Sequence, residues 1–126
     1  MKVIIAGSRF DMQDKELTLR MKREVMKGIS DSGFEITEVV SGTARGFDTL
    51  GELYAKKFLV PVTRFPADWN KYGKGAGYIR NSDMADYADA LIAFWDGKSR
   101  GTRNMIQLAE LKGLKVHVHR VEIVEI

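Results

Sequence analysis

Short runs of apolar, largely β-branched residues alternate with amphipathic stretches along the whole of this chain. The runs at residues 3–6, 36–40, 60–65 and 90–94 have the length of strands, and they are apolar on both faces. Such alternation is typical of a parallel sheet that carries helices on both faces and right-handed crossovers. We therefore expect a three-layer, Rossmann-like α/β fold with about five strands. Residues 115–126 are expected to add one or two short strands at the end.

The expected helices cover residues 14–33, 44–58, 79–87 and 102–112. Gly33 suits the left-handed conformation that often follows the last turn of a helix. Residues 66–77 remain as a long loop that is rich in aromatic and basic side chains. Pro61 has no N–H to donate, so the strand at 60–65 is expected to start there or to lie at a sheet edge.

The composition excludes several classes of protein. The chain has 126 residues, which is the size of one domain, so we expect a single domain over 1–126. It has no cysteine, which excludes disulfides, zinc–thiolate sites and iron–sulfur clusters. His117 and His119 are its two histidines, and we expect them as solvated residues on one face of an edge strand. Two histidines alone do not make a metal site, so none is expected.

No apolar run is long enough to span a membrane, and the N-terminal run is too short for a secretory signal. We therefore expect a cytoplasmic protein with no membrane partner. The formal net charge is +3, which is compatible with an anionic ligand. That charge is too small to indicate nucleic acid as the partner.

Ligands of open α/β sheets bind beyond the carboxyl ends of the strands, so the segments that follow the strands are the candidate site. Three of them combine glycine, a small hydroxyl residue and arginine. The candidate ligand-binding residues there are Gly7, Ser8 and Arg9, then Ser41, Gly42, Thr43, Arg45, Gly46 and Asp48, then Asp96, Gly97, Ser99, Gly101 and Thr102. Trp69, Arg80 and Asn81 complete the candidate set.

These residue types suit a phosphate. Glycine lets the backbone approach a ligand, and the first amides of a helix point outward with no partner inside the helix. Arginine offers a planar fork that matches phosphate oxygens. Taken singly, each segment also has a simpler interpretation: a plain turn, Thr102 as a helix cap, or Asp48 as a capping residue. Three such segments at one sheet edge favour a binding site.

The loop at 66–77 is the other candidate, because Trp69 or Tyr72 could stack on a base or form a lid. Packing of these aromatic rings on the domain's own core is an equal alternative. The standard phosphate-binding and dinucleotide-binding glycine motifs are both missing from the sequence.

Five segments together resemble a known family. They are residues 7–9, 40–48, 66–77, 80–84 and 94–102, and they look like the YspA/YpsA-related branch of the SLOG superfamily. This superfamily groups Rossmann-like domains similar to the DprA and LOG proteins. The resemblance runs from Val3 to about Val118 and implies a nucleotide-binding domain of this type.

Within that resemblance, Arg80 and Asn81 match a motif that LOG phosphoribohydrolases place beside their substrate. Ser99, Gly101 and Thr102 match the turn that cradles phosphate. In LOG enzymes a catalytic acid follows this turn closely, whereas here the nearest downstream acid is Glu110. This departure favours a binding or sensing role, or an activity that uses other acids such as Asp48 or Asp96.

We therefore expect a protein that binds a nucleotide-derived, phosphate-bearing small molecule such as an adenine nucleotide, NAD or an ADP-ribose-like compound, with no required cofactor. The alternative is a nucleotide-processing hydrolase, for which Asp48, Asp96 and Arg80 are the candidate catalytic residues, with Asp83 as a further acid near the rim. DprA-like nucleic-acid binding is a weaker alternative, because the net charge argues against it. The apolar residues at 121–126 leave self-association open.

Overall fold

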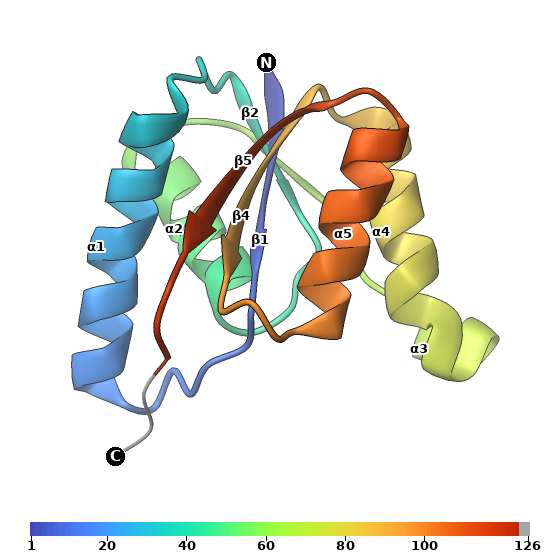
Figure 1. The fold of residues 1–126 in the computed structure, drawn as a ribbon, viewed down its shortest axis with the longest axis horizontal. Helices are drawn as coiled ribbons and strands as arrows, with labels where there is room; N and C mark the ends of the chain where they lie inside the picture. The colour runs from blue at the N-terminus through green and yellow to red at the C-terminus, as the bar shows by residue number, and fades with distance from the viewer. Residues whose placement is uncertain (124–126) are drawn as a thin grey trace.

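The computed structural model describes residues 1–123 and forms a five-strand, all-parallel sheet between two helical layers (Figure 1). The elements in chain order are β1 (Lys2–Gly7), α1 (Lys15–Ser32), β2 (Glu38–Ser41), α2 (Phe47–Lys57), β3 (Val62–Arg64), α3 (Trp69–Tyr72), a 3₁₀ turn η1 (Gly73–Gly75), α4 (Ala76–Tyr87), β4 (Ala90–Trp95), α5 (Arg100–Leu111) and β5 (Lys115–Arg120). The strand order is β3-β2-β1-β4-β5. The expected Rossmann-like α/β fold is confirmed.

The order of strands reverses at β1. Val3 of β1 lies opposite Val39 of β2 on one side and opposite Ala90 of β4 on the other. The chain builds outward from β1 to β3, and then crosses back to build β4 and β5. The carboxyl ends of β1 and β4 therefore form the switch point at which such sheets bind ligands.

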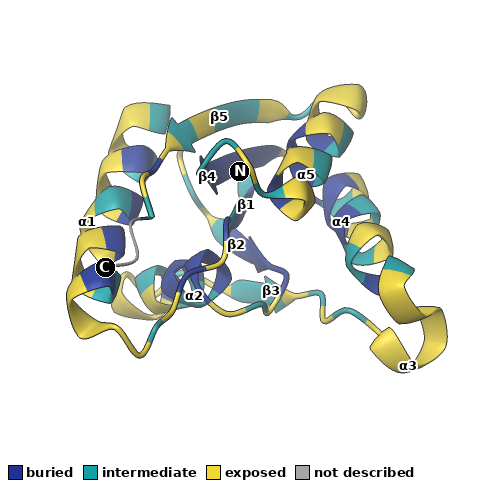
Figure 2. Cartoon of the chain, turned by 60° about the horizontal axis from the view of Figure 1, so that its bottom comes forward, coloured by how far each residue is buried: buried dark blue, intermediate teal, exposed yellow. Residues whose placement is uncertain are grey.

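Alternate residues of the strands face two separate cores. Ile5 and Ile92 belong to the core under α1 and α2, whereas Ile4 and Leu91 belong to the core under α4 and α5. The inner faces of these helices and the central strands are buried, while α3 is exposed throughout (Figure 2). α1 is capped by Asp14 before its first residue and by Gly33 after its last one, so its bounds agree with the prediction to within one residue.

Three aromatic rings pack together in the core under α1 and α2, close to the carboxyl ends of β1 and β4. The ring of Phe47 stacks on that of Phe94 with centroids 5.0 Å apart, and Phe10 meets Phe47 edge-on at 5.0 Å. A Cβ at Gly7 would lie 2.5 Å from the carbonyl oxygen of Phe94 and 2.6 Å from the ring of Phe47. Gly7 is therefore required where β1 ends, because no side chain fits there.

Several expected boundaries were wrong. α2 begins at Phe47 rather than at residue 44, because Gly46 has φ +96°, which no helical residue adopts. α5 is capped by Ser99 and begins at Arg100, so Thr102 lies inside the first turn. The loop at 66–77 contains α3 and η1, and α4 begins at Ala76 rather than at residue 79.

The C-terminal region and its histidines also differ from expectation. β5 ends at Arg120, and 124–126, where a further strand was expected, lie outside the described residues. The histidines lie on an edge strand as expected, but they are half-buried rather than solvated. Nε2 of His119 lies 2.5 Å from Oε2 of Glu24 on α1, and Nε2 of His117 is buried without a partner among residues 1–123. None of the helices in this part of the chain is long and apolar enough to cross a membrane.

Candidate functional site

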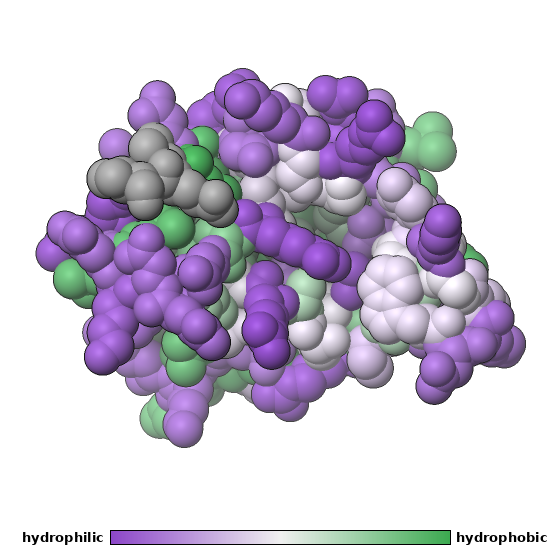
Figure 3. All heavy atoms as spheres, turned by 90° about the horizontal axis from the view of Figure 1, so that it is seen from below, coloured by the Kyte–Doolittle hydropathy of each residue, from purple (hydrophilic) through white to green (hydrophobic). Residues whose placement is uncertain are grey.

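A cleft opens beyond the carboxyl ends of β1, β2 and β4. It has three adjoining compartments of about 350, 100 and 460 Å³, and all three share Arg9 and Arg80 as wall residues. We name them by a residue that lines only one of the three: the Arg45, the Asp48 and the Tyr78 compartment. Figure 3 looks onto this end of the molecule, where hydrophilic side chains border a hollow.

Most of the predicted ligand-binding residues line this cleft. They are Gly7, Arg9, Gly42, Thr43, Arg45, Asp48, Trp69, Arg80, Asn81, Asp96, Ser99, Gly101 and Thr102. Four others, Ser8, Ser41, Gly46 and Gly97, lie in the same turns but do not line it. Ser8 is 1% exposed and Ser41 is fully buried. Their hydroxyl groups therefore stabilise the turns through hydrogen bonds inside the protein and do not face the cleft.

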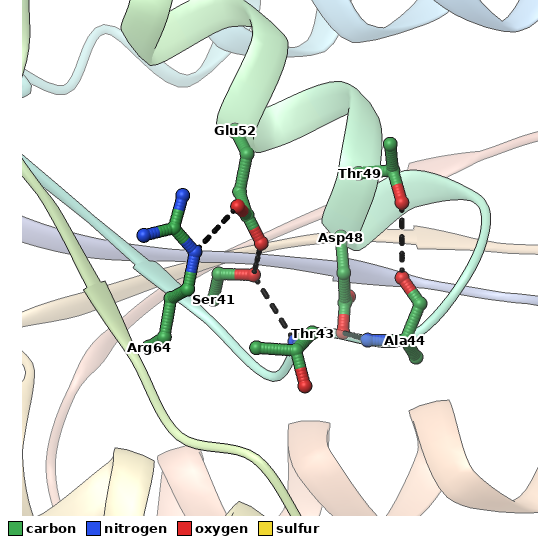
Figure 4. Close-up of polar contacts among 7 residues, drawn as sticks. All are labelled: Ser41, Thr43, Ala44, Asp48, Thr49, Glu52 and Arg64. Carbon is green, nitrogen blue, oxygen red and sulfur yellow. Dashed lines mark hydrogen bonds and ion pairs between the residues drawn. The ribbon is translucent and has the colours of Figure 1, made fainter.

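A network of hydrogen bonds stabilises the turn between β2 and α2 (Figure 4). The Ser41 hydroxyl donates to Oε2 of Glu52 at 2.7 Å and accepts from the N–H of Thr43 at 3.1 Å. Nε of Arg64 donates to the other Glu52 oxygen at 2.7 Å. Thr43 is held at φ +63°, a left-handed conformation that is costly for a β-branched residue. Such strain is a feature of functional loops.

Asp48 lies at the base of the cleft, in the first turn of α2. It is 7% exposed, and its Oδ2 accepts a hydrogen bond from the N–H of Ala44 at 3.0 Å. Burial raises the pKa of Asp48 to about 6, although the Ala44 hydrogen bond and the charge of Arg80 act in the opposite direction. A carboxyl group with this pKa carries its proton in an appreciable fraction of molecules near neutral pH.

Arg80 reaches from α4 toward the β2–α2 turn. Its Nη1 donates to the carbonyl oxygen of Gly42, and its Nε donates to Oδ1 of Asn81 at 3.0 Å. A Cβ at Gly42 would lie 2.9 Å from both Nη1 of Arg80 and Oδ2 of Asp48, so only glycine lets these groups approach. Asn81 is held in turn by Asn104, which accepts from its Nδ2 at 3.0 Å.

The turn between β4 and α5 is fixed by Asp96. One carboxylate oxygen accepts from the N–H groups of Lys98 and Ser99, each at 2.8 Å, and the Asp96 N–H donates to the Ser8 hydroxyl at 3.1 Å. Burial acts to raise the pKa of Asp96, but these hydrogen bonds outweigh it and the pKa is lowered. Asp96 is therefore an ionised structural residue, which makes it a poor candidate for a proton donor.

The first turn of α5 faces the cleft without obstruction. The Ser99 hydroxyl accepts from the N–H of Thr102 at 3.4 Å, while the preceding amides of a first helical turn have no partner inside the helix. A Cβ at Gly101 would meet nothing within 4 Å, although Gly101 lines both the Asp48 and the Tyr78 compartments. A ligand can therefore approach this backbone closely.

The arginines of the cleft, Arg9, Arg45 and Arg80, form no direct ion pair in the part of the chain that the structure describes, although Asp48 lies near Arg80. Arg9 and Arg45 are exposed, and Arg80 is half-buried. The described part of the chain also gathers no three side chains that could hold a metal ion. The guanidinium groups of these three arginines line one cleft.

Trp69 on α3, a predicted ligand-binding residue, is one of the aromatic residues of the cleft. It is 54% exposed and lines both the Arg45 and the Tyr78 compartments, whereas Tyr72 lines neither. Packing of this loop on the domain core, one of the two expected alternatives, was therefore wrong for Trp69. Asp83 is exposed on α4 and also lies outside the lining of the cleft.

Several residues that line the cleft or support its turns were not predicted from the sequence. Phe10, Ala44 and Tyr78 line the cleft, but their residue types gave no signal. Glu52 was also missed, although its position one helical turn after Asp48 places it beside the same loop. Its two hydrogen bonds make it the residue that fixes the turn.

The fold and the cleft define a Rossmann-like α/β protein with a basic site at the switch point of its sheet. The chain is 38% identical over 84 residues to the Gene 61 protein of Mycobacterium phage D29, a match that covers 62% of this chain and 67% of that protein. The chain therefore belongs to the same family as this phage protein, whose name describes no activity. No family model and no solved structure matches the chain.

Proposed function

We propose that this protein binds a nucleotide or nucleotide-derived small molecule, through its phosphate, in the cleft at the strand ends. The observation that carries the proposal is that Arg9, Arg45 and Arg80 line one cleft without a carboxylate partner among residues 1–123. Arg9 and Arg80 also line the two compartments that Gly101, in the first turn of α5, borders. Arginine forks and helix amides together are the common means of holding phosphate.

The remaining lining residues suit the other parts of a nucleotide. In this proposal Asp48, which lines the smallest compartment, accepts hydrogen bonds from ribose hydroxyls. A base stacks on Trp69, which is exposed and lines both larger compartments. An adenine nucleotide, NAD or an ADP-ribose-like compound has these parts. The resemblance to the SLOG superfamily points to the same class of ligand, and membership of that superfamily is part of the proposal.

A second candidate function is hydrolysis of the N-glycosidic bond of such a nucleotide. The raised pKa of Asp48 favours it, because a protonated carboxyl group can donate its proton to the departing base. Water would then add to the ribose carbon, which yields the free base and a ribose phosphate. Nucleotides that remain intact after long incubation with the protein would leave binding as the function.

A thermal-shift screen tests the binding proposal. The panel holds AMP, GMP, NAD, ADP-ribose, cyclic AMP and a short single-stranded oligonucleotide. A ligand at about a hundred times its Kd should stabilise the protein by about 2.7 kcal/mol, which is a shift of several degrees. Stabilisation by the oligonucleotide alone, with a steep salt dependence, would instead indicate nucleic-acid binding.

Variants then locate the site. Arg45→Ala should weaken binding of the best ligand by about 1.5–3 kcal/mol, which is roughly tenfold to 150-fold in Kd. Arg23→Ala is the matched control, because Arg23 is an exposed arginine on α1 and does not line the cleft. Equal affinities of the two variants would remove Arg45 from the site, and a panel without any shift would refute the proposal.

A further inference from the structure

A second depression lies between α1 and α2, on the helical layer opposite α4 and α5. This α1–α2 groove has a volume of about 270 Å³, and its walls are Lys22, Met26, Leu53, Tyr54, Lys57 and Phe58. Its floor is Val25 and Leu50, which are 2% and 3% exposed. The groove shares no lining residue with the cleft.

The walls of the groove carry large apolar side chains that remain about half exposed to solvent. α1 fills the core with Leu17, Met21 and Val25, yet Met26 remains 45% exposed on its outer side. On α2, Leu53 and Phe58 are 44% and 48% exposed. Contiguous apolar surface of this kind usually marks an interaction site, and methionine and aromatic residues are enriched at protein interfaces.

The charge around the groove indicates what covers it. Lys22 and Lys57 stand among the wall residues, and no acidic residue lines the groove. A second copy of this chain in the same groove would bring lysine against lysine. The acidic side chains of a partner would instead pair with Lys22 and Lys57 at the rim, and its apolar side chains would contact the floor between these two lysines.

We propose that the α1–α2 groove docks an amphipathic helix of a partner protein. Its apolar face carries residues at helical spacing that fill the space between Met26, Leu53 and Phe58, and its flanks carry Asp or Glu that face Lys22 and Lys57. Helix-in-groove recognition commonly takes this form. Because groove and cleft are separate, the partner and the small-molecule ligand bind together without competition.

Peptide display tests the proposal directly, because the selection itself supplies the binding sequences. Random peptides of about 15 residues, long enough for an amphipathic helix, are selected on the immobilised protein and counter-selected on Leu53→Glu. Enriched sequences should combine apolar residues at helical spacing with acidic flanks. They should bind the protein at least tenfold more tightly than Leu53→Glu or Met26→Glu, two substitutions at half-exposed positions.

Two further comparisons separate charge from shape. Leu111→Glu on α5 makes the same charge change at an 82% exposed position outside the groove, so it should bind like the unaltered protein. The double variant K22E/K57E should lose about tenfold in affinity at low salt and less at high salt.

Three results would overturn the proposal. One is a selection that enriches nothing beyond the counter-selected variants, and another is enrichment of basic or uncharged peptides. The third is a dimer in analytical ultracentrifugation that Leu53→Glu dissociates, because the occupant would then be a second copy of this chain. Circular dichroism confirms that each variant is folded before it is compared.

Discussion

Replacement of Asp48 by asparagine should change how stability depends on pH. The pKa of Asp48 is raised by burial from 3.8 to about 6 in the folded protein. A carboxyl group whose pKa is raised on folding contributes full stability only below its unfolded pKa. That contribution is lost as the pH rises through the folded value. A shift of this size corresponds to about 3 kcal/mol.

Asparagine keeps the shape of the side chain and an oxygen for the Ala44 N–H, but it cannot ionise. The Asp48→Asn protein should therefore gain stability relative to the unaltered protein by about 2 kcal/mol as the pH rises from 4 to 7, which is most of the full shift. Urea unfolding at a series of pH values measures this difference. Asp83→Asn, which removes an exposed carboxylate from α4, controls for the loss of one negative charge. A difference between Asp48→Asn and the unaltered protein that stays constant within about 1 kcal/mol across this range would refute the reasoning that burial dominates at Asp48.

Three other substitutions test particular features. Gly101→Ala should stabilise α5 by about 0.5–1 kcal/mol, yet it should weaken nucleotide binding in calorimetry because the added Cβ occupies space in the cleft. Ser30→Ala on α1 is the control, since it should stabilise the protein without affecting binding. Binding unchanged in Gly101→Ala would place the ligand elsewhere. Phe47→Ala should cost about 3–5 kcal/mol in urea unfolding, and a loss below about 2 would contradict its central packing. Thr43→Gly should keep or raise the melting temperature, because relief of about 1–2 kcal/mol of strain outweighs the flexibility of glycine; a clear fall would show that Thr43 is unstrained.

The strand positions were predictable because burial on both faces leaves a direct mark in the sequence. The runs around Ile4, Val40 and Ile92 can only be accommodated inside a sheet, and parallel order follows from the helices between them. The location of the site then followed from topology, since the segments after β1, β2 and β4 must meet at one edge.

The direction in which a side chain points, and the surroundings that it packs against, could not be predicted from the sequence in the same way. Ser8 and Ser41 have the residue types of ligand contacts, but their hydroxyls turn inward to Asp96 and Glu52. A glycine–serine turn carries no signal for which side its hydroxyl faces. The burial of His119 depends on Glu24, which is distant in the chain and comes close only through the packing of α1 on β5.

Amide NMR spectra with added AMP, NAD and ADP-ribose test the central claim most directly. The account predicts that one of these compounds shifts the amides of Gly101 and Thr43, which line different compartments of the cleft, while amides beside the α1–α2 groove, such as that of Leu53, stay in place. Spectra that remain unchanged at high ligand concentration, or shifts confined to residues that line the α1–α2 groove, would contradict it.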